Sequence, residues 1–186
     1  TTQDIMDTAV VMQIRDAHKI ITDQVKALLR ICLERAKENK NVAMAGRTHG
    51  QHAVPITLGY KIAIWADEFG RHLERLEEGE SRYLTGQLAG AAGTLASLGE
   101  QGLEVQDRMC RILGLHTPVS TWHVARDGFA EFASTVAIIA GTVGKIANEF
   151  INLERTEICE LEESFSMGKV GSSTMPHKRN PMVCEN

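Results

Sequence analysis

The sequence predicts an all-α fold built as a bundle of long helices, and three features of its apolar residues favour this class. They recur at intervals of three or four over long stretches, no stretch alternates convincingly with a period of two, and the longest apolar seam is too long for a small globule to cover alone. The 186 residues can bury a core, and we treat 1–186 as one domain. Because both ends look like helices already begun, we expect the central domain of a longer chain whose flanking domains are absent.

Four segments with an apolar stripe on one face are the expected helices. They are Ile5–Glu38, Pro55–Tyr83, Leu103–Leu113 and Gly128–Glu163, with a further helix beginning at Met182. The last of the four gives the strongest signal, because its apolar residues keep an a/d seam from Phe129 to Leu153. This expected helix would be roughly 50 Å long. Pro55 suits the first turn of a helix. We expect 46–53 to be a loop and the glycine-rich stretch 84–102 to form loops or close helix contacts.

Composition and charge exclude several classes of protein. Lys and Arg number 20 against 24 Asp and Glu, a formal net charge of −4, whereas a protein built mainly to hold nucleic acid needs a basic surplus. No apolar run approaches the roughly 20 residues of a membrane span, and residues 1–7 lack the basic region of a signal peptide. The 4 cysteines are scattered like free thiols of a reducing compartment. We therefore expect a cytoplasmic protein without nucleic-acid or membrane partners.

Three polar islands interrupt the apolar helices and are the candidate functional segments. They are residues 1–4, 46–52 and 168–181. The third offers small residues that let backbone amides approach an anion, hydroxyls as nucleophile or base, and positive charge on His177, Lys178 and Arg179. Such a loop suits a substrate that carries carboxylates, with charge stabilised as it develops. The alternative interpretation is a flexible surface connection between two helices.

The second island holds His49 and His52 beside Thr48 and Gln51. Histidine is the side chain best suited to proton transfer near neutral pH. The two histidines have no adjacent acid and do not form the H-E-x-x-H pattern, so we predict no metal site. The alternative is a capped loop whose histidines pack against backbone. For the first island the alternative is a helix N-cap.

A fourth candidate lies in the connection before the last long helix. Trp122 and His123, followed by Arg126, would suit the lining of a pocket. The same residues would equally suit an anchor at a helix start, with Asp127 as the N-cap. The residues alone leave both interpretations open.

The segment Gly171–Pro181, Gly-Ser-Ser-Thr-Met-Pro-His-Lys-Arg-Asn-Pro, closely resembles the signature of the fumarase/aspartase superfamily. Residues 46–55 resemble the second block of that superfamily and residues 1–7 its first, in the same order and at similar spacing. The resemblance covers the whole chain. It implies the central helical domain of a fumarase/aspartase-like subunit, a homotetramer whose long helices form a shared bundle, and active sites that are each assembled from three subunits.

Carried over residue by residue, the resemblance implies catalytic roles. Ser172 matches the base that removes a proton from the carbon beside a carboxylate, and His49 matches the acid that protonates the leaving group. Lys178 and Asn180 match residues that bind the substrate and stabilise its aci-carboxylate intermediate. Such an elimination moves a proton and a leaving group, so we expect no cofactor.

The remaining substrate-binding candidates come from the same three blocks. They are Thr2, Gln3, Thr48, Gln51, Ser173 and Met175. Thr2 and Gln3 match the block that holds a substrate carboxylate, and Thr48 neighbours the acid. The expected partner is therefore a small di- or tricarboxylate.

Two branches of the superfamily compete for the substrate. The stretch 152–158, the acids within 160–163 and the ending 185–186 resemble adenylosuccinate lyases, which usually have Gln where Trp122 stands. The stretch 122–127 resembles the 3-carboxy-cis,cis-muconate cycloisomerases of aromatic catabolism. We expect a lyase that eliminates fumarate from a succinyl-type substrate, with adenylosuccinate, giving AMP and fumarate, favoured over the cycloisomerase. A third interpretation is a non-catalytic structural bundle like the lens crystallins of the superfamily.

Overall fold

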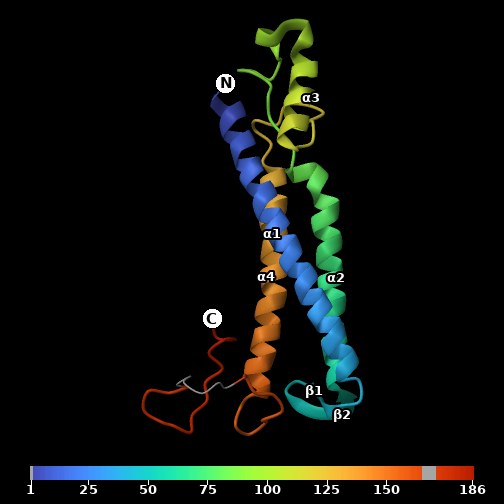
Figure 1. The fold of residues 1–186 in the computed structure, drawn as a ribbon, viewed down its shortest axis with the longest axis vertical. Helices are drawn as coiled ribbons and strands as arrows, with labels where there is room; N and C mark the ends of the chain where they lie inside the picture. Colours follow the sequence, from blue (N-terminus) through green and yellow to red (C-terminus); the bar gives the residue numbers. More distant parts are fainter. Residues whose placement is uncertain (1, 165–170) are drawn as a thin grey trace. The chain divides into compact units, whose positions relative to one another are not determined.

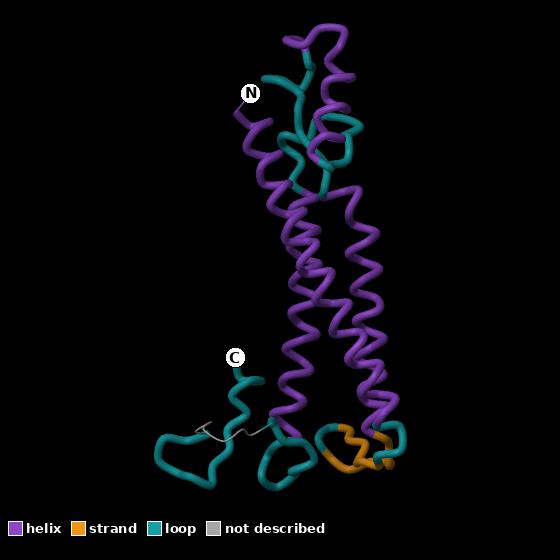
Figure 2. The backbone as a smooth tube through the Cα atoms, in the orientation of Figure 1, coloured by secondary structure: helices purple, strands orange, loops and turns teal. Residues whose placement is uncertain are grey.

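The structure, a computed structural model, describes residues 2–164 and 171–186 (Figure 1). Most of these residues are helical, as Figure 2 shows, so the predicted all-α fold class is confirmed. The chain divides into two compact units: unit 1 comprises Thr1–Cys32 and Ala66–Ala137, and unit 2 comprises Leu33–Trp65 and Ile138–Asn186. Three long helices contribute residues to both units. They are α1 (Thr2–Glu38), α2 (Leu58–Tyr83) and α4 (Asp127–Leu153).

Unit 1 has an apolar core between the first turns of α1 and the segment that leads into α4. Val11, Cys110 and Leu115 are buried there. The partly buried side chains packed against them are Met12, Met109, Leu113, Trp122 and Phe129. One face of α1 is buried against this core near the start of the helix. Burial of apolar surface contributes most of the stability of such a helix.

The end of α2 is fixed in unit 1 by a buried tyrosine. Tyr83 is 2% exposed, its hydroxyl donates to the carbonyl oxygen of Leu76 at 2.8 Å, and its ring centroid lies 5.3 Å from that of Phe132 and 5.6 Å from that of His18. Burial raises the pKa of Tyr83 to about 12. The side chain is therefore held in its neutral form throughout the physiological range.

The glycine-rich stretch is a loop that also makes a close contact, so both parts of the expectation hold. It leads through the 3-10 helix η1 (Ala96–Gln101) into α3 (Gly102–Leu113). Gly86 lies against Cys110, because a Cβ there would be 2.7 Å from the Cys110 sulfur. The amide of Gly86 donates to the carbonyl of His116 at 3.0 Å, and the amide of His116 donates to Leu84 at 2.8 Å.

Unit 2 contains a β-hairpin where the sequence predicts a loop. β1 (Ala43–Thr48) pairs antiparallel with β2 (Gln51–Thr57), and the two residues between them have left-handed backbone, with φ of 52° at His49 and 73° at Gly50. Two positive φ values in a two-residue connection define the type I′ turn that suits the twist of a hairpin. Gly46 lies at an irregularity in the register, where a Cβ would be 2.4 Å from the carbonyl oxygen of Val54.

Several predicted boundaries are wrong, and each has a physical reason. Most of β2 is exposed, so no apolar alternation marks it as a strand, and Pro55 belongs to this strand and not to the first turn of α2. α4 ends at Leu153, ten residues before the predicted Glu163. Its last apolar seam residue is also Leu153, whose carbonyl accepts the amide of Glu160 at 2.9 Å in place of a helical bond. The predicted helix at Met182 is a turn.

By length and composition alone, α4 could cross a membrane, a property it shares with core helices of soluble bundles. This corrects the expectation that no apolar run approaches that length. Only 11% of its apolar window is buried within the chain. Phe, Val, Ile and Leu side chains, together with alanine, give the helix that apolar character.

Candidate active site

The first polar island lies at the start of α1, where Asp4 points into unit 1. Asp4 is 1% exposed, and its carboxylate accepts the backbone amides of Ala89 at 3.0 Å and Gly90 at 3.1 Å. Its Oδ1 also lies 2.9 Å from Nε2 of His123. A buried carboxylate is stable only when hydrogen bonds replace its hydration, and this one binds the glycine-rich loop and the 122–126 segment to α1.

One turn further along α1, Asp7 forms a second polar contact on the same face. Its carboxylate accepts Nε2 of Gln3 at 2.7 Å and the guanidinium of Arg126 at 2.8 Å. Thr8 next to it exchanges hydrogen bonds with the backbone of Gln87. Of the two first-block residues predicted to bind a substrate carboxylate, Gln3 is thus half-buried and bonded to Asp7, whereas Thr2 is exposed.

The contacts of the 122–126 segment favour the anchor interpretation. Trp122 donates its indole N–H to the carbonyl of Gly86 at 3.0 Å, and its ring meets Phe129 edge-on, with centroids 5.5 Å apart. The guanidinium of Arg126 lies 5.8 Å from the Trp122 ring centroid. Together with the contact of His123 with Asp4 and the ion pair of Arg126 with Asp7, these contacts fix the entry into α4.

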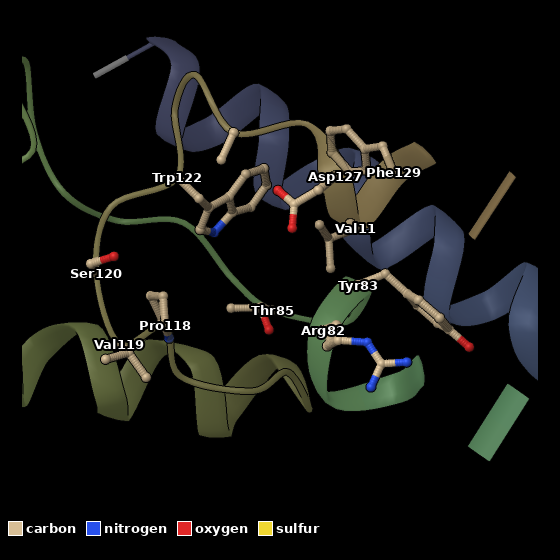
Figure 3. A pocket seen from close by; sticks show the side chains of 12 residues that line it. Val11, Arg82, Tyr83, Thr85, Pro118, Val119, Ser120, Trp122, Asp127 and Phe129 are labelled. Atoms are coloured by element: carbon tan, nitrogen blue, oxygen red, sulfur yellow. The ribbon is translucent and has the colours of Figure 1, made fainter. Parts of the chain in front are cut away.

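Trp122 also lines a small cavity of about 180 Å³ in unit 1 (Figure 3). Figure 3 shows Trp122 and Asp127 on one side of it and Thr85 and Arg82 on the other. Its main polar groups face protein partners: Arg82 binds Glu131, whose pKa is lowered by this contact, and also the carbonyl of Glu78. Trp122 is the one predicted site residue in this lining, so the cavity does not assemble the predicted chemistry.

The second island forms the tip of the hairpin in unit 2. Thr48, His49 and Gln51 are all exposed there, at the end of β1, in the turn and at the start of β2. The turn makes His49 prominent, since a left-handed histidine followed by glycine directs the chain sharply back. His49 is exposed in this turn and is not buried within the chain.

An ion pair that the sequence analysis did not anticipate fixes this hairpin. Arg47 binds Glu160 through two nitrogens, at 2.9 Å and 2.5 Å, and its guanidinium lies 3.3 Å from Nε2 of His52. Hydrogen bonding to Arg47 lowers the pKa of Glu160, and the same bond raises the pKa of Arg47. The pairing could not be read from the sequence because the two residues are 113 positions apart.

In the described part of the third island, Ser172, the predicted base, is half-buried. Its hydroxyl oxygen accepts the backbone amides of Met175 at 3.2 Å and Thr174 at 3.4 Å. Amide donors directed at an oxygen favour its deprotonated form, which is the form that a base needs. Ser173, Met175 and Lys178 are exposed and Asn180 is half-buried. The predicted residues 168–170 lie outside the described residues.

The segment just before this loop supports it through two acids. Glu162 forms an ion pair with Arg179. Glu163 accepts the amides of Val183 at 3.1 Å and Cys184 at 2.9 Å. Burial, together with a hydrogen bond to Glu163, raises the pKa of the Cys184 thiol to about 11, which favours its protonated form at neutral pH.

The loop borders an open cavity of about 1130 Å³ in unit 2. Lys178 and Asn180 line it, as do His177 and Arg179. Glu154, which follows the end of α4, also lines it, and burial raises the pKa of that carboxyl. The lining therefore combines basic and amide groups of the loop with the acids Glu154, Glu162, Glu163 and Glu185.

The predicted residues thus form three separate groups. Unit 1 joins Gln3 to the 122–126 segment, and unit 2 holds the hairpin tip and the signature loop, between which no contact is recorded in the described chain. Among residues 2–164 and 171–186, no three His, Cys, Asp or Glu side chains converge as a metal site would require. The sequence analysis missed the contacts of Asp4 and Asp7. Their signal was an Asp-x-x-Asp spacing on the helix face that also carries Val11.

The chain is similar to known proteins along its whole length. A protein family described as "Lyase" matches residues 1–186. The chain is 54% identical to N-acetyl-S-(2-succino)cysteine lyase of Enterococcus italicus, over 100% of this chain and 41% of that protein. It is 48% identical to adenylosuccinate lyase of Methanocaldococcus jannaschii, over 100% of this chain and 40% of that protein.

A solved structure agrees with these relatives. The 3-carboxy-cis,cis-muconate lactonizing enzyme of Pseudomonas putida matches with a TM-score of 0.92 at 40% identity, over 100% of this chain and 41% of that chain. The fold is thus that of a lyase domain. The chain belongs to the fumarase/aspartase superfamily of lyases, as the signature loop predicted. It spans about two fifths of the length of the curated relatives it matches.

Proposed function

We propose that this chain is the central domain of a lyase that eliminates fumarate from a succinyl-substituted thioether of the N-acetyl-S-(2-succino)cysteine type. The observation that carries the proposal is the 54% identity to a lyase of that name along the whole chain. The general reaction class is the one expected from the sequence, whereas the leaving atom differs. Sulfur replaces the purine nitrogen of adenylosuccinate.

The proposed reaction is a β-elimination across the two central carbons of the succinyl group. Ser172 takes the proton from the carbon beside the distal carboxylate, and the electron pair is held on that carboxylate as a dianionic aci form. Lys178 and Asn180 stabilise this charge, which develops mostly in the transition state. The carbon–sulfur bond then breaks, the carbon–carbon double bond of fumarate forms, and the thiol portion leaves.

The other residues of the three blocks hold the substrate. Thr2 and Gln3, with Thr48 and Gln51, supply hydroxyl and amide groups for the carboxylates, while Ser173 and Met175 close over them from the signature loop. His49 supplies the proton for the leaving group. The reaction as written transfers a proton and an electron pair without a change of redox state, so we propose that it uses no cofactor.

Adenylosuccinate is the second candidate substrate, and the 48% identity to an adenylosuccinate lyase along the whole chain favours it. The two candidates differ in how much they need an acid. A cysteine-type thiol has a pKa of about 8.5 and departs readily as a thiolate. An amine nitrogen is a poor leaving group as an anion and requires protonation. His49 is therefore more important for the nitrogen substrate.

We further propose that the protein is a cytoplasmic homotetramer in which each site takes its blocks from three subunits. Within unit 2, the lack of a recorded contact between the described residues of the hairpin tip and of the signature loop supports this proposal. So do the exposed apolar side chains on the long helices, among them Ile20 on α1, Ile64 on α2 and Val143 on α4. A bundle formed with other subunits would cover them.

The proposal is tested with the full-length protein, purified as an oligomer of measured mass. Fumarate release is followed with N-acetyl-S-(2-succino)cysteine, adenylosuccinate and 3-carboxy-cis,cis-muconate in parallel. We expect the highest kcat/KM with the thioether, with one free thiol released per fumarate. A higher kcat/KM with adenylosuccinate would move the assignment to the second candidate. Lactone formation from the muconate without fumarate release from either succinyl compound would refute both.

A further inference from the structure

The acidic segment, Glu160–Glu163, lies between the end of α4 and the signature loop, and its three acids reach in different directions. Glu160 binds Arg47, next to the hairpin tip. Glu162 binds Arg179, between the two proposed substrate-binding residues of the loop. Glu163 accepts amides just beyond the loop. This four-residue stretch thus contacts two of the three polar islands, the hairpin island 46–52 and the signature-loop island 168–181.

We propose that the acidic segment is a positioning element that supports both the His49 hairpin and the Ser172 loop, with Glu160 as its principal residue. None of its acids touches the substrate in this scheme. The inference rests on the proposed function, because it assigns the hairpin tip and the loop to an active site. It adds a role for residues that no catalytic block contains.

The Arg47–Glu160 pair has the geometry of a specific contact. It is bidentate, and the two side chains are only 18% and 25% exposed. A guanidinium and a carboxylate joined by two parallel hydrogen bonds fix orientation as well as distance. Since Arg47 immediately precedes Thr48, the pair sets the direction in which β1 delivers Thr48 and His49 to the turn.

The other two contacts differ from it in a way that ranks the three acids. The Glu162–Arg179 pair is exposed, at 54% and 56%, and exposed ion pairs contribute little because water screens them. Glu163 binds backbone amides, which a neutral glutamine also does through its carbonyl oxygen. Loss of charge should therefore matter most at Glu160, less at Glu163 and least at Glu162.

The experiment uses the full-length lyase with Glu160→Gln, Glu163→Gln and Glu162→Gln, and with Glu38→Gln as the matched control. Glu38 forms an exposed ion pair with Arg35 in the same unit, at 58% and 65% exposure. Small displacements of catalytic groups cost up to about 100-fold in rate. We expect kcat to fall about 10- to 100-fold for Glu160→Gln, with KM within about threefold. Glu162→Gln and Glu38→Gln should remain within about twofold of wild type.

Two further measurements separate positioning from loss of fold. The double variant Arg47→Glu with Glu160→Arg restores an ion pair of reversed polarity and should recover kcat relative to either single change. Arg47→Lys keeps the charge and loses the bidentate geometry, so it should show a smaller loss of kcat even if Glu160→Gln fails to assemble. Equal kcat for wild type, Glu160→Gln and Arg47→Lys would overturn the inference.

A measurement without substrate distinguishes failure of this inference from failure of the proposed function. Hydrogen exchange of the peptide 43–57 reports the hairpin directly. Exchange should accelerate in Glu160→Gln and remain unchanged in Glu38→Gln. If the wild type turns over none of the three substrates, the proposed function fails whatever the exchange shows. If the wild type is active but the hairpin exchange and kcat of Glu160→Gln match it, only the positioning role fails.

Discussion

Replacing Asp4 by asparagine should release the glycine-rich loop from the start of α1. The carboxylate is 1% exposed and is contacted by two backbone amides and His123 at 2.9 to 3.1 Å. Asparagine has the same shape but one acceptor oxygen in place of two, and its amide group would face N–H donors. The change therefore removes one or two charge-assisted hydrogen bonds from a site that water does not reach.

Each hydrogen bond to a charged group contributes about 1.5–3 kcal/mol, so the local cost is about 2–4 kcal/mol. The free energy of local opening governs amide exchange, and about 1.4 kcal/mol corresponds to tenfold. The amides of Ala89 and Gly90 should exchange about 30- to 900-fold faster in the variant. Exchange measured by mass spectrometry on peptides that cover 84–95 in the full-length protein tests this.

The matched control is Asp16→Asn, which makes the same chemical change on the same helix. The Asp16 side chain is 70% exposed and pairs only with the adjacent Arg15 among the contacts of the described chain. Its exchange profile should equal that of wild type. If Asp4→Asn left the 84–95 peptides unchanged while the hairpin peptides exchanged normally, the role assigned to the buried carboxylate would be refuted.

Three further predictions concern the chemistry and the pH dependence. Ser172→Ala should lower kcat about 10²- to 10⁴-fold while the oligomer and circular dichroism stay unchanged, and near-normal turnover would remove Ser172 as the base. His49→Gln should reduce turnover of adenylosuccinate more than that of the thioether, and equal losses would indicate a binding role. The pKa of Tyr83 is raised from 10.0 to about 12 in the folded protein. Its contribution to the free energy of unfolding is therefore fully present below pH 10 and is lost as the pH rises towards 12, a loss of about 2.7 kcal/mol. Tyr83→Phe should flatten this part of the plot of unfolding free energy against pH.

The long helices could be predicted from the sequence because their apolar residues repeat with the helical period, which depends only on local geometry. The observed end of α4 is also visible in the sequence pattern, because the apolar seam stops at Leu153, although the predicted helix continued to Glu163. The hairpin could not be predicted in the same way. Most of β2 is exposed, so no apolar alternation marks it as a strand, and the turn depends on a left-handed His49 that composition does not reveal.

The candidate site residues come from motifs in the sequence and stay a prediction, whereas the contacts around them could not be predicted. Ser172, His49, Lys178 and Asn180 belong to contiguous motifs that resemble a known family. The contacts that hold them in place join residues far apart in sequence, as Arg47 does with Glu160. The sequence does not show which basic residue a given acid of the 160–163 segment binds. That pairing becomes visible only in the folded structure.

Features that depend on residues close together in sequence could therefore be predicted, whereas features that depend on distant residues needed the structure. Helix periodicity and catalytic blocks are local, and they identified the family. They do not choose between substrates, since relatives along the whole chain include both N-acetyl-S-(2-succino)cysteine lyases and adenylosuccinate lyases. Trp122 illustrates the point. The sequence alone suggests that it distinguishes two branches of the superfamily. In the structure its N–H donates to the carbonyl of Gly86 and its ring packs edge-on against Phe129. A residue fixed so firmly by its own chain is better suited to orient the entry into α4 than to select between a thiol and an amine.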